Sequence, residues 1–401
     1  MTLTQLDTSV DAGTVPRERK LRIVHCFRSP VGGIFKHVRD LVEAQAAQGH
    51  EVGIVCDSST GGELEDALFN TLHPSLALGL ERVPMRRAIG PSDIGAVMRL
   101  SRRLHAIRPD ILHSHGAKGG AYGRLVGTML RRTGSPVSRL YCPHGGSIHY
   151  DRSSWGGRLF FTLERWLELS TDRLVFVSDY ERRGYIEKVG RPRCPSSLVY
   201  NGLAADEFAA IEVEHDAADF LYIGMMRDLK GVDLFMHALA ALRSQGREAT
   251  AVAVGDGPDL ERYRKLAKTL GLSRSLRFAP PEPARTAMRF GRTVVVPSRA
   301  ESMPYIVLET LAANRPIIAT DVGGVPEIFG TSAPLVRPGD LEDLTRHMAR
   351  ALVSPPMHPQ ARDRVEELFS RDAMVASVMR AYRSTLIADE MGEATLAPDE
   401  L

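Results

Sequence analysis

The amino-acid sequence predicts an α/β protein in which two doubly wound domains follow one another along the chain. Apolar runs of strand length alternate with amphipathic helical stretches, glycine turns join many of them, and the alternation restarts near residue 217. Because parallel strands need crossover connections, this alternation is typical of parallel sheets covered by helices. A chain of 401 residues is long enough for two such domains.

The first strand–helix–strand unit carries the pattern in its simplest form. The apolar run at 21–27 is expected to be a buried strand, and a glycine-containing turn follows it. Apolar positions from Ile34 to Ala46 repeat on one helical face, and Gly49 closes that helix. The next strand is expected at 51–57, so the unit is that of a parallel sheet.

The remaining elements follow the same alternation. In the first half, strands are expected at 110–115, 138–142 and 173–178, and helices at about 93–107, 119–132 and 155–170. In the second half, strands are expected at 219–224, 250–257, 276–280, 293–298 and 315–324, and helices at 231–246, 258–272, 304–313, 340–353, 358–368 and 370–386.

This order of elements divides the chain. The expected parts are a disordered lead-in (1–19), an N-terminal domain (20–195), a linker (196–216), a C-terminal domain (217–370), a helix that packs back on the N-terminal domain (371–390) and a tail (391–401). Ligands of such sheets bind at the carboxyl ends of the strands, so two facing domains should place a cleft between them.

Composition excludes several classes of protein. Hydrophobic residues make up 43% and charged residues 25% of the chain, as in ordinary globular proteins, which excludes a collagen, a disordered tail protein and a membrane bundle. We expect no secretory signal, because the first 20 residues lack an apolar core. Four scattered cysteines without a C-x-x-C pair predict reduced thiols in a cytoplasmic protein, namely Cys26, Cys56, Cys142 and Cys194.

The net charge of +2 conceals an asymmetry. Residues 20–195 hold 26 lysines and arginines against 17 acidic residues, whereas residues 196–401 hold 23 against 29. A basic first half favours contact with an anionic membrane surface or an anionic substrate. The segments that would make it are 85–90, 99–108 and 129–134. No nucleic-acid partner is expected, because no aromatic stacking platform lies among these arginines.

The strongest motif lies in the second half, between 299 and 327. Glu301 and Glu309 are eight positions apart, and Pro304 stands where the segment turns helical. The free amides of a helix start can hold an anion, and a carboxylate further along can accept ribose hydroxyls. The alternative is a pair of solvated helix carboxylates. The buried strand before the motif and the D-V-G-G-V-P-E turn after it favour the binding interpretation.

Eight motifs in order resemble glycosyltransferase family 4, over about residues 20–385. They are GG-x3-H-V-x-D-L (32–41), L-H-S-H-G (112–116), P-H-G (143–145), V-x-N-G-L (199–203), I-G-x5-K-G (223–231), V-G-D-G-P (254–258), P-S-R-A-E-S-M-P-x4-E (297–309) and D-V-G-G (321–324). The resemblance implies the GT-B fold: two facing Rossmann-like domains with an inter-domain cleft, the first binding the acceptor and the second the nucleotide sugar.

The implied activity is that of a retaining glycosyltransferase. It would move a sugar from a nucleoside diphosphate sugar to a hydroxyl of a glycan or lipid-linked acceptor, in the synthesis of a polysaccharide, glycolipid or other cell-surface glycan. We expect no cofactor and no essential metal, and a cytoplasmic protein that is peripheral at the inner face of the membrane. The alternatives are a nucleotide-sugar epimerase or a phosphorylase on the same fold, and a non-catalytic nucleotide-sugar-binding protein.

The resemblance also assigns residues on the donor side. Glu309 would hold the ribose, Glu301 the sugar hydroxyls or phosphate edge, and Lys230 the diphosphate. Family members usually carry an arginine at the position of Met225, and we expect Arg227 to supply that charge. The expected contributors of backbone contacts to the donor are Met303, Pro304 and Tyr305, with Gly255 as a further candidate.

On the acceptor side, the resemblance points to a glycine turn and a histidine. Gly32 and Gly33 would let backbone approach the donor, and His115 would lie near the reactive carbon of the sugar. His144 is a further candidate. His113 shares a strand face with His115, but no third histidine or carboxylate motif converges on the pair, so no metal site is expected. The remaining early histidines, His25 and His37, are interpreted as structural or peripheral.

Overall fold

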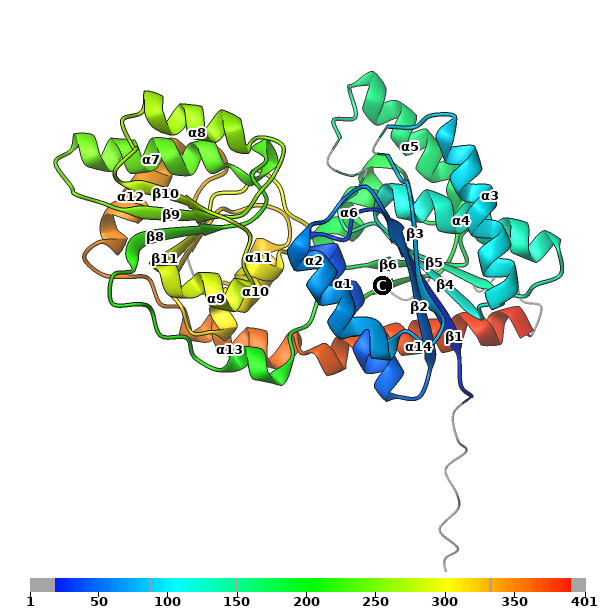
Figure 1. The fold of residues 1–401 in the computed structure, drawn as a ribbon. Coiled ribbons are helices and arrows are strands. Elements are labelled where there is room, and N and C mark those ends of the chain that lie inside the picture. The colour runs from blue at the N-terminus through cyan, green and yellow to red at the C-terminus, as the bar shows by residue number, and fades with distance from the viewer. Residues whose placement is uncertain (1–18, 87, 147, 149, 332–333, 391–401) are drawn as a thin grey trace, which may run out of the picture.

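The computed structural model describes residues 19–390 apart from 87, 147, 149 and 332–333 (Figure 1). The expected lead-in, except for Arg19, and the expected tail at 391–401 lie outside the described residues. Among the described helices, none combines the length and the apolar character that crossing a bilayer requires.

The N-terminal domain is built on a parallel sheet of seven strands in the order β3-β2-β1-β4-β5-β6-β7. Its strands are β1 (Arg22–Phe27), β2 (Glu51–Asp57), β3 (Gly79–Val83), β4 (Ile111–His115), β5 (Ser138–Cys142), β6 (Arg173–Phe176) and β7 (Ser196–Leu198). Its helices are α1 (Gly32–Ala47), α2 (Glu63–Leu72), α3 (Ser92–Ile107), α4 (Gly116–Arg132), α5 (Trp155–Leu167) and α6 (Asp179–Lys188).

One boundary differs from the expectation. Ser196–Leu198, expected as the start of the linker, form β7 and pair in parallel with β6. This strand has three residues and is only partly buried at the sheet edge, so it lacks the apolar run that marks the central strands. The other edge strand, β3, was not expected either. Its residues before Val83 are only partly buried, so it also lacks an apolar run.

The C-terminal domain has a parallel sheet of five strands in the order β10-β9-β8-β11-β12. Its strands are β8 (Ala218–Ile223), β9 (Ala251–Val254), β10 (Leu276–Ala279), β11 (Gly291–Val296) and β12 (Ile317–Ala319). Its helices are α7 (Val232–Ser244), α8 (Leu260–Thr269), α9 (Ala284–Ala287), α10 (Tyr305–Ala312), α11 (Val325–Phe329), α12 (Leu341–Ala351) and α13 (Pro359–Leu368).

The last helix, α14 (Arg371–Glu390), runs from the C-terminal domain to the N-terminal domain (Figure 1). The Tyr382 hydroxyl lies 2.8 Å from Nδ1 of His113, and Arg173 Nε donates to Thr385 Oγ1 at 3.0 Å. Buried residues of α14 belong to an apolar cluster that contains strand residues of both sheets. The helix therefore ties the two domains into one packed body.

The strand order reverses once in each sheet. The reversal falls between β1 and β4 in the first sheet and between β8 and β11 in the second. Ligands of doubly wound sheets bind outside the carboxyl ends of the strands at such switch points. The sequence motifs follow these four strands, so the two switch points are where the site is to be sought.

Candidate active site

Lys230 and Glu301 meet at the switch point of the C-terminal sheet. Lys230 ends η5 (Asp228–Lys230) after β8, and Glu301 follows β11. Lys230 Nζ donates to both carboxylate oxygens of Glu301, at 2.7 and 2.9 Å, and Ser298 Oγ donates to Oε1 at 2.7 Å. Glu301 is buried, while the Lys230 side chain keeps 31% of its exposure. The structure thus brings together two residues that the sequence predicted for the donor site.

Glycines allow the backbone around this pair to come together. Gly231 has φ +67°, and a Cβ there would lie 2.0 Å from the carbonyl oxygen of Pro297. Gly323 of the D-V-G-G motif has φ +62°, and a Cβ there would lie 1.7 Å from the carbonyl oxygen of Glu301. A larger residue at either position would push the turns away from the end of β11.

Arg227, at the same edge, has no anionic partner among the residues that the structure describes. Arg299 is bound to Asp233 at 2.6 and 2.8 Å, and Arg262 lies 3.2 Å from Asp228. The half-buried Arg227 side chain forms no hydrogen bond or ion pair with the described part of the chain. Met225, at the position of the family arginine, only accepts a hydrogen bond from the Tyr222 hydroxyl through its carbonyl. Gly255, which follows β9, packs against the backbone of Gly224, which follows β8.

The start of α10 offers free backbone amides beside this charged edge. Pro304 is the residue before the helix and gives it no side-chain cap. Within the described residues, no acceptor takes the amide hydrogens of Tyr305 and Ile306. Such amides, together with the positive end of the helix dipole, favour an anion. Met303 contributes its carbonyl to Asn201 Nδ2 at 2.8 Å.

The glycine turn after β1 reaches the start of α10. Gly32, with φ +66°, begins α1, and a Cβ on Gly33 would lie 3.4 Å from Cδ2 of Tyr305. The Tyr305 ring is buried, with Lys36 Nζ 5.3 Å from its centroid. The Gly32–Gly33 turn of the N-terminal domain therefore contacts the start of α10 in the C-terminal domain, and both were predicted for the site.

Glu309 faces the N-terminal domain from the next turn of α10. Its Oε1 lies 3.9 Å from Lys36 Nζ, and Lys36 also binds Glu207 at 2.9 Å and lies 3.5 Å from Asp40. Burial raises the pKa of Glu309 to about 7, although Lys36 opposes this shift. Burial likewise raises the pKa of Asp40 to about 6. The charged partner of Glu309 is therefore Lys36, a lysine of the other domain.

Five histidines meet at the switch point of the N-terminal sheet, four of them buried and His144 half-buried. They are His25 on β1, His37 on α1, His113 and His115 on β4, and His144 after β5. His115 Nε2 lies 3.0 Å from Nδ1 of His25, and His115 Nδ1 lies 3.1 Å from Nε2 of His144.

One expectation about these histidines is wrong, and a second holds only in part. His25, His37 and His144 do converge on the His113–His115 pair, in two groups of three in which each ring offers one nitrogen within 4.8 Å of the others. His25 and His37 have 0% and 1% exposure, so the peripheral interpretation is excluded and the structural one is left. The convergence arises because β1 pairs with β4 in a register that sets His25 opposite His113.

Burial keeps this group of histidines uncharged. It lowers the pKa of His144 to about 3 and that of His25 to about 4, and it lowers the pKa values of the other three well below the ordinary value. Each neutral ring offers one N–H donor and one acceptor nitrogen. The N-terminal switch point therefore suits uncharged polar groups, whereas the C-terminal one suits an anion.

Two residues that join the domains were missed by sequence reasoning. Asn201 Oδ1 accepts from His37 Nδ1 at 3.1 Å while its Nδ2 binds Met303, so it links α1 to α10. Glu327 accepts the backbone amides of Asp179 and Tyr180 at 2.9 and 2.7 Å, at the start of α6. Asn201 lies in the motif V-x-N-G-L of the resemblance, and Glu327 ends the D-V-G-G-V-P-E turn that follows the 301–309 motif, and these were the available signals.

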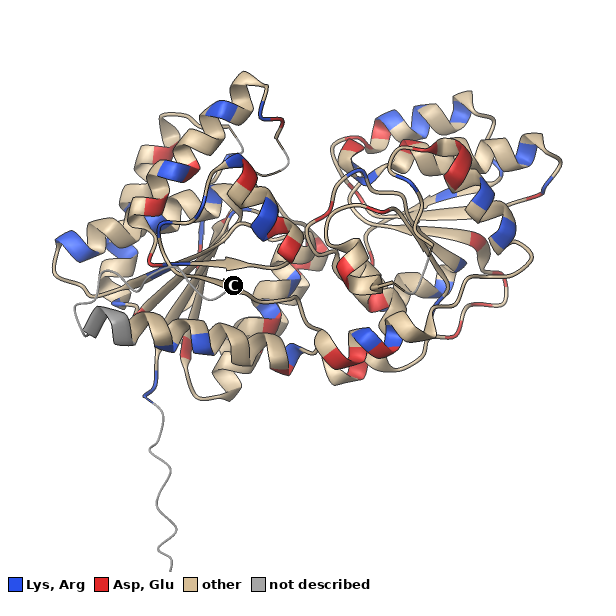
Figure 2. Cartoon of the chain, turned by 180° about the vertical axis from the view of Figure 1, so that it is seen from behind, with Lys and Arg blue, Asp and Glu red and all other residues tan. Residues whose placement is uncertain are grey.

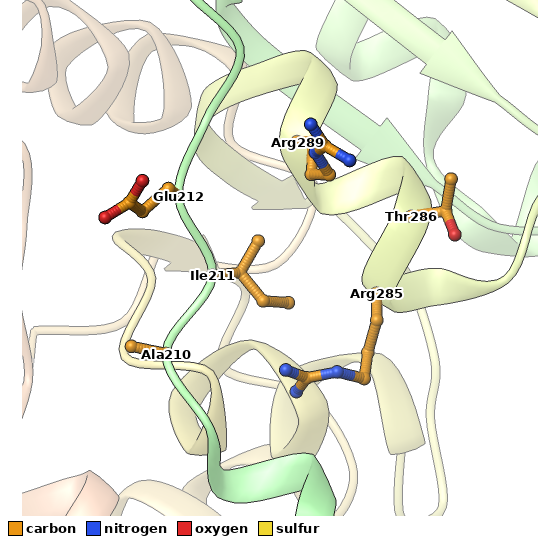
Figure 3. A pocket seen from close by; sticks show the side chains of 6 residues that line it. All are labelled: Ala210, Ile211, Glu212, Arg285, Thr286 and Arg289. Atoms are coloured by element: carbon orange, nitrogen blue, oxygen red, sulfur yellow. The ribbon is translucent and has the colours of Figure 1, made fainter.

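A surface pocket of about 380 Å³ lies beside α9 (Figure 3). The chain at 210–212 and the side chains of Arg285, Thr286 and Arg289 line it. Arg285 already donates to the carbonyl oxygens of Glu207 and Ala209, at 2.7 and 2.8 Å. The pocket thus offers no second charged centre comparable to the edge of β8 and β11.

Comparison with known proteins decides the family. A model of Glycosyltransferase Family 4 matches residues 31–207, and a model of Glycosyl transferases group 1 matches residues 217–354. The alpha-D-kanosaminyltransferase of Streptomyces kanamyceticus is 30% identical over 311 residues, which cover 70% of this chain and 77% of that protein. The chain belongs to glycosyltransferase family 4.

Further relatives of this family 4 glycosyltransferase agree. The D-inositol 3-phosphate glycosyltransferase of Frankia alni is 28% identical over 309 residues, 69% of this chain and 74% of that protein. Among solved structures, sucrose-phosphate synthase from Thermosynechococcus elongatus superposes with a TM-score of 0.72 and 19% identity, covering 92% of this chain and 100% of that one. The predicted GT-B fold and glycosyltransferase activity are confirmed, and these comparisons give no support to an epimerase or a non-catalytic protein.

Proposed function

We propose that this glycosyltransferase transfers a sugar from a nucleoside diphosphate sugar to an acceptor hydroxyl, with the donor bound at the carboxyl ends of β8 and β11. The observation that carries the proposal is the charged edge made by Lys230, Glu301 and Arg227, which has no partner within the described parts of the chain. The free amides at the start of α10 add to its attraction for a diphosphate.

Each donor-side residue then has a role that its chemistry supports. Lys230 and Arg227 neutralise the charge that grows on the departing diphosphate, which lowers the barrier to transfer. Glu301 orients Lys230 through two hydrogen bonds and offers its carboxylate edge to sugar hydroxyls. Glu309 accepts the ribose hydroxyls. No metal or cofactor is needed in this scheme, because fixed cations and helix amides supply the charge.

Membership of family 4 supports a reaction with retention. The bond between the anomeric carbon and the phosphate oxygen breaks, and a new bond forms to the acceptor oxygen on the same face. A diphosphate oxygen takes the proton of the acceptor hydroxyl. The neutral ring of the half-buried His144, together with the Gly32–Gly33 turn, holds the sugar and the acceptor by hydrogen bonds. His115 was expected to contact the sugar itself, but it is fully buried and both of its ring nitrogens bind other histidines, so its role is to orient His144.

We also propose that the enzyme is cytoplasmic and works at the inner face of the membrane, on a lipid-linked or other glycan acceptor for a polysaccharide, glycolipid or cell-surface glycan. The basic surplus of the N-terminal domain lies on several of its helices (Figure 2). The outer face of α5 exposes Trp155 by 87%, Leu159 by 56% and Trp166 by 72%. Tryptophans beside basic residues such as the exposed Arg158 are typical of surfaces that bind the membrane interface.

The test of the proposed function is a thermal-shift screen with uridine, guanosine and adenosine diphosphate sugars. A ligand at 100 times its Kd stabilises a protein by about 2.7 kcal/mol. The donor identified in this way is then supplied with a glycan or glycolipid acceptor, and NMR reports the anomeric configuration of the product. An α-linked donor should give an α-linked product, and inversion would contradict the mechanism.

A further inference from the structure

Three histidines of the N-terminal switch point differ from the other two in the hydrogen-bond partners of their ring nitrogens. His37, His115 and His144 each place one ring nitrogen within 4.8 Å of the others. His37 and His115 are fully buried, and His144 is half-buried. What such a group can bind depends on which nitrogens carry protons and which present lone pairs.

The partner of His37 determines its tautomer. Asn201 donates from Nδ2 to the carbonyl oxygen of Met303, so the amide oxygen of Asn201 is the atom that faces His37 Nδ1. Nδ1 of His37 must therefore carry the proton. Nε2 of His37 is left as a buried lone pair, and it has no hydrogen-bond partner within the described residues.

A second chain of hydrogen bonds determines the tautomer of His115. Gln45 Oε1 accepts from His25 Nε2 at 2.9 Å, so His25 presents a bare Nδ1. His115 Nε2 donates to that atom at 3.0 Å, which leaves Nδ1 of His115 as a lone pair. This lone pair faces His144 Nε2 at a distance of 3.1 Å.

We propose that His37, His115 and His144 form a binding site for a divalent transition-metal ion of the zinc class. Zn–N bonds of about 2.0–2.1 Å place two nitrogens of a tetrahedral site roughly 3.3–3.4 Å apart, close to the separation of His115 and His144. The ion replaces the proton shared by these two rings, and the proton moves to Nδ1 of His144. His37 Nε2 supplies the third bond, and the half-buried side of His144 leaves the fourth position to water.

The outer partners support this assignment. Metal-binding histidines donate their second N–H to a fixed acceptor, which orients the ring. Asn201 accepts from His37 and His25 accepts from His115 in this way. Ligands that are neutral imidazoles, without a carboxylate among them, favour zinc, copper, cobalt or nickel over magnesium or calcium.

The other group of three, His25, His113 and His115, is less suitable. Tyr382 accepts a hydrogen bond from Gln45 and donates its own hydrogen to Nδ1 of His113, so Nε2 of His113 carries a proton instead of a lone pair. In this group His115 faces its neighbour His25 with the nitrogen that carries its proton, whereas it faces His144 with a lone pair.

A bound ion has a functional consequence, and this part rests on the proposed function. It occupies the half-buried His144, which would otherwise hold the sugar and acceptor, together with the His115 ring behind it. Zinc should therefore inhibit transfer, a chelator should restore it, and magnesium should have no effect. Binding of the ion itself does not depend on the proposed reaction.

The test is a titration of the full chain with Co²⁺, followed by the d–d absorption bands of a tetrahedral nitrogen site, and with Zn²⁺ against a chromophoric chelator. We expect one ion per chain in the wild type. The Asn201→Ala variant should bind roughly 10- to 100-fold more weakly, as loss of an outer partner does, and His37→Ala more weakly still. The exposed His105 provides the matched control, His105→Gln, which should bind like the wild type.

Circular dichroism and thermal unfolding without metal establish that each variant is folded. If His37→Ala fails to fold, the half-exposed ligand provides the alternative variant, His144→Gln. Wild-type affinity in a folded ligand variant, or absence of one tight Zn²⁺ per chain, would overturn the proposal. A glycosyltransferase that is active but binds no Zn²⁺ would disprove this site and leave the proposed function intact.

Discussion

The two switch points of this enzyme differ in how they handle charge. At the C-terminal sheet, Lys230 is one-third exposed and bound to Glu301, and Arg227 is unpaired among the described residues. At the N-terminal sheet, four buried histidines and the half-buried His144 lie together, and their pKa values are lowered. The same fold thus presents a charged edge in one domain and a neutral polar edge in the other.

The two similar domains are therefore suited to different parts of the reaction. A diphosphate leaving group needs compensating cations, which remain ionised only where water or a counter-ion reaches them. A sugar and its acceptor hydroxyl need neutral donors and acceptors whose directions are fixed. If this division is real, substitutions at the two edges should differ in the step that they affect and in the size of the effect.

Removing the charge of Lys230 should affect turnover most. For Lys230→Ala we expect kcat to fall by about 10²- to 10³-fold, as when one stabilising donor of a transition-state anion is lost. Steady-state kinetics with the identified donor measure this. The control is Lys265→Ala, at an exposed lysine of α8, which should keep wild-type kcat. An unchanged kcat in Lys230→Ala would remove the leaving-group role.

The proposed membrane surface belongs to the N-terminal domain alone. The double variant Trp155→Ser, Trp166→Ser should bind anionic vesicles about 100-fold more weakly, because burying each large apolar side chain contributes roughly 1.5 kcal/mol or more. Vesicle flotation measures the partition. Val353→Ser changes an equally exposed residue (83%) of the C-terminal domain and should have no effect. Equal binding by the wild type and the double variant would exclude α5 as the docking face.

A substitution of Glu309 tests whether the ribose of the donor binds at the interface between the domains. In Glu309→Ala, loss of hydrogen bonds from a charged group should cost roughly 1.5–3 kcal/mol of donor binding, which is about 10- to 150-fold in affinity. Calorimetric titration with the nucleoside diphosphate gives the value. Affinity equal to that of the wild type would place the ribose elsewhere.

The raised pKa of Glu309, about 7 against an ordinary value of 4.5, predicts a pH dependence of stability. The folded state binds the proton more tightly than the unfolded state, so the stability of the fold falls as pH rises from about 4.5 to about 7. Glu309→Gln should therefore stabilise the protein more at pH 8 than at pH 5, by a difference on the order of 2 kcal/mol. Thermal unfolding at both pH values measures this difference. A larger gain at pH 5 would contradict the assignment of the shift.

Much of the fold and of the charged edge is predictable from the sequence. Apolar runs indicate the buried strands, and the glycines at 231 and 323–324 mark turns that must approach the end of β11. Lys230 and Glu301 follow neighbouring strands of one sheet, so their meeting could be expected. The polar edge strands β3 and β7 could not be recognised, because a half-exposed edge does not require an apolar run.

The missed features depend on register and on backbone partners. His25 joins His113 because of the pairing of β1 with β4, which no spacing along the chain reveals. Asn201 and Glu327 bind a carbonyl oxygen and two amides of distant segments, and backbone atoms have no sequence signature. The exposed tryptophans of α5 carry meaning only once the structure leaves them uncovered.

The most direct test of this division of labour is a crystal structure of the enzyme with the nucleoside diphosphate that stabilises it most. We expect the diphosphate oxygens within hydrogen-bond distance of Lys230 Nζ, the Arg227 guanidinium and the first amides of α10, with the ribose at Glu309. A nucleotide seated among the histidines of β1 and β4, with Lys230 and Arg227 facing solvent, would contradict it.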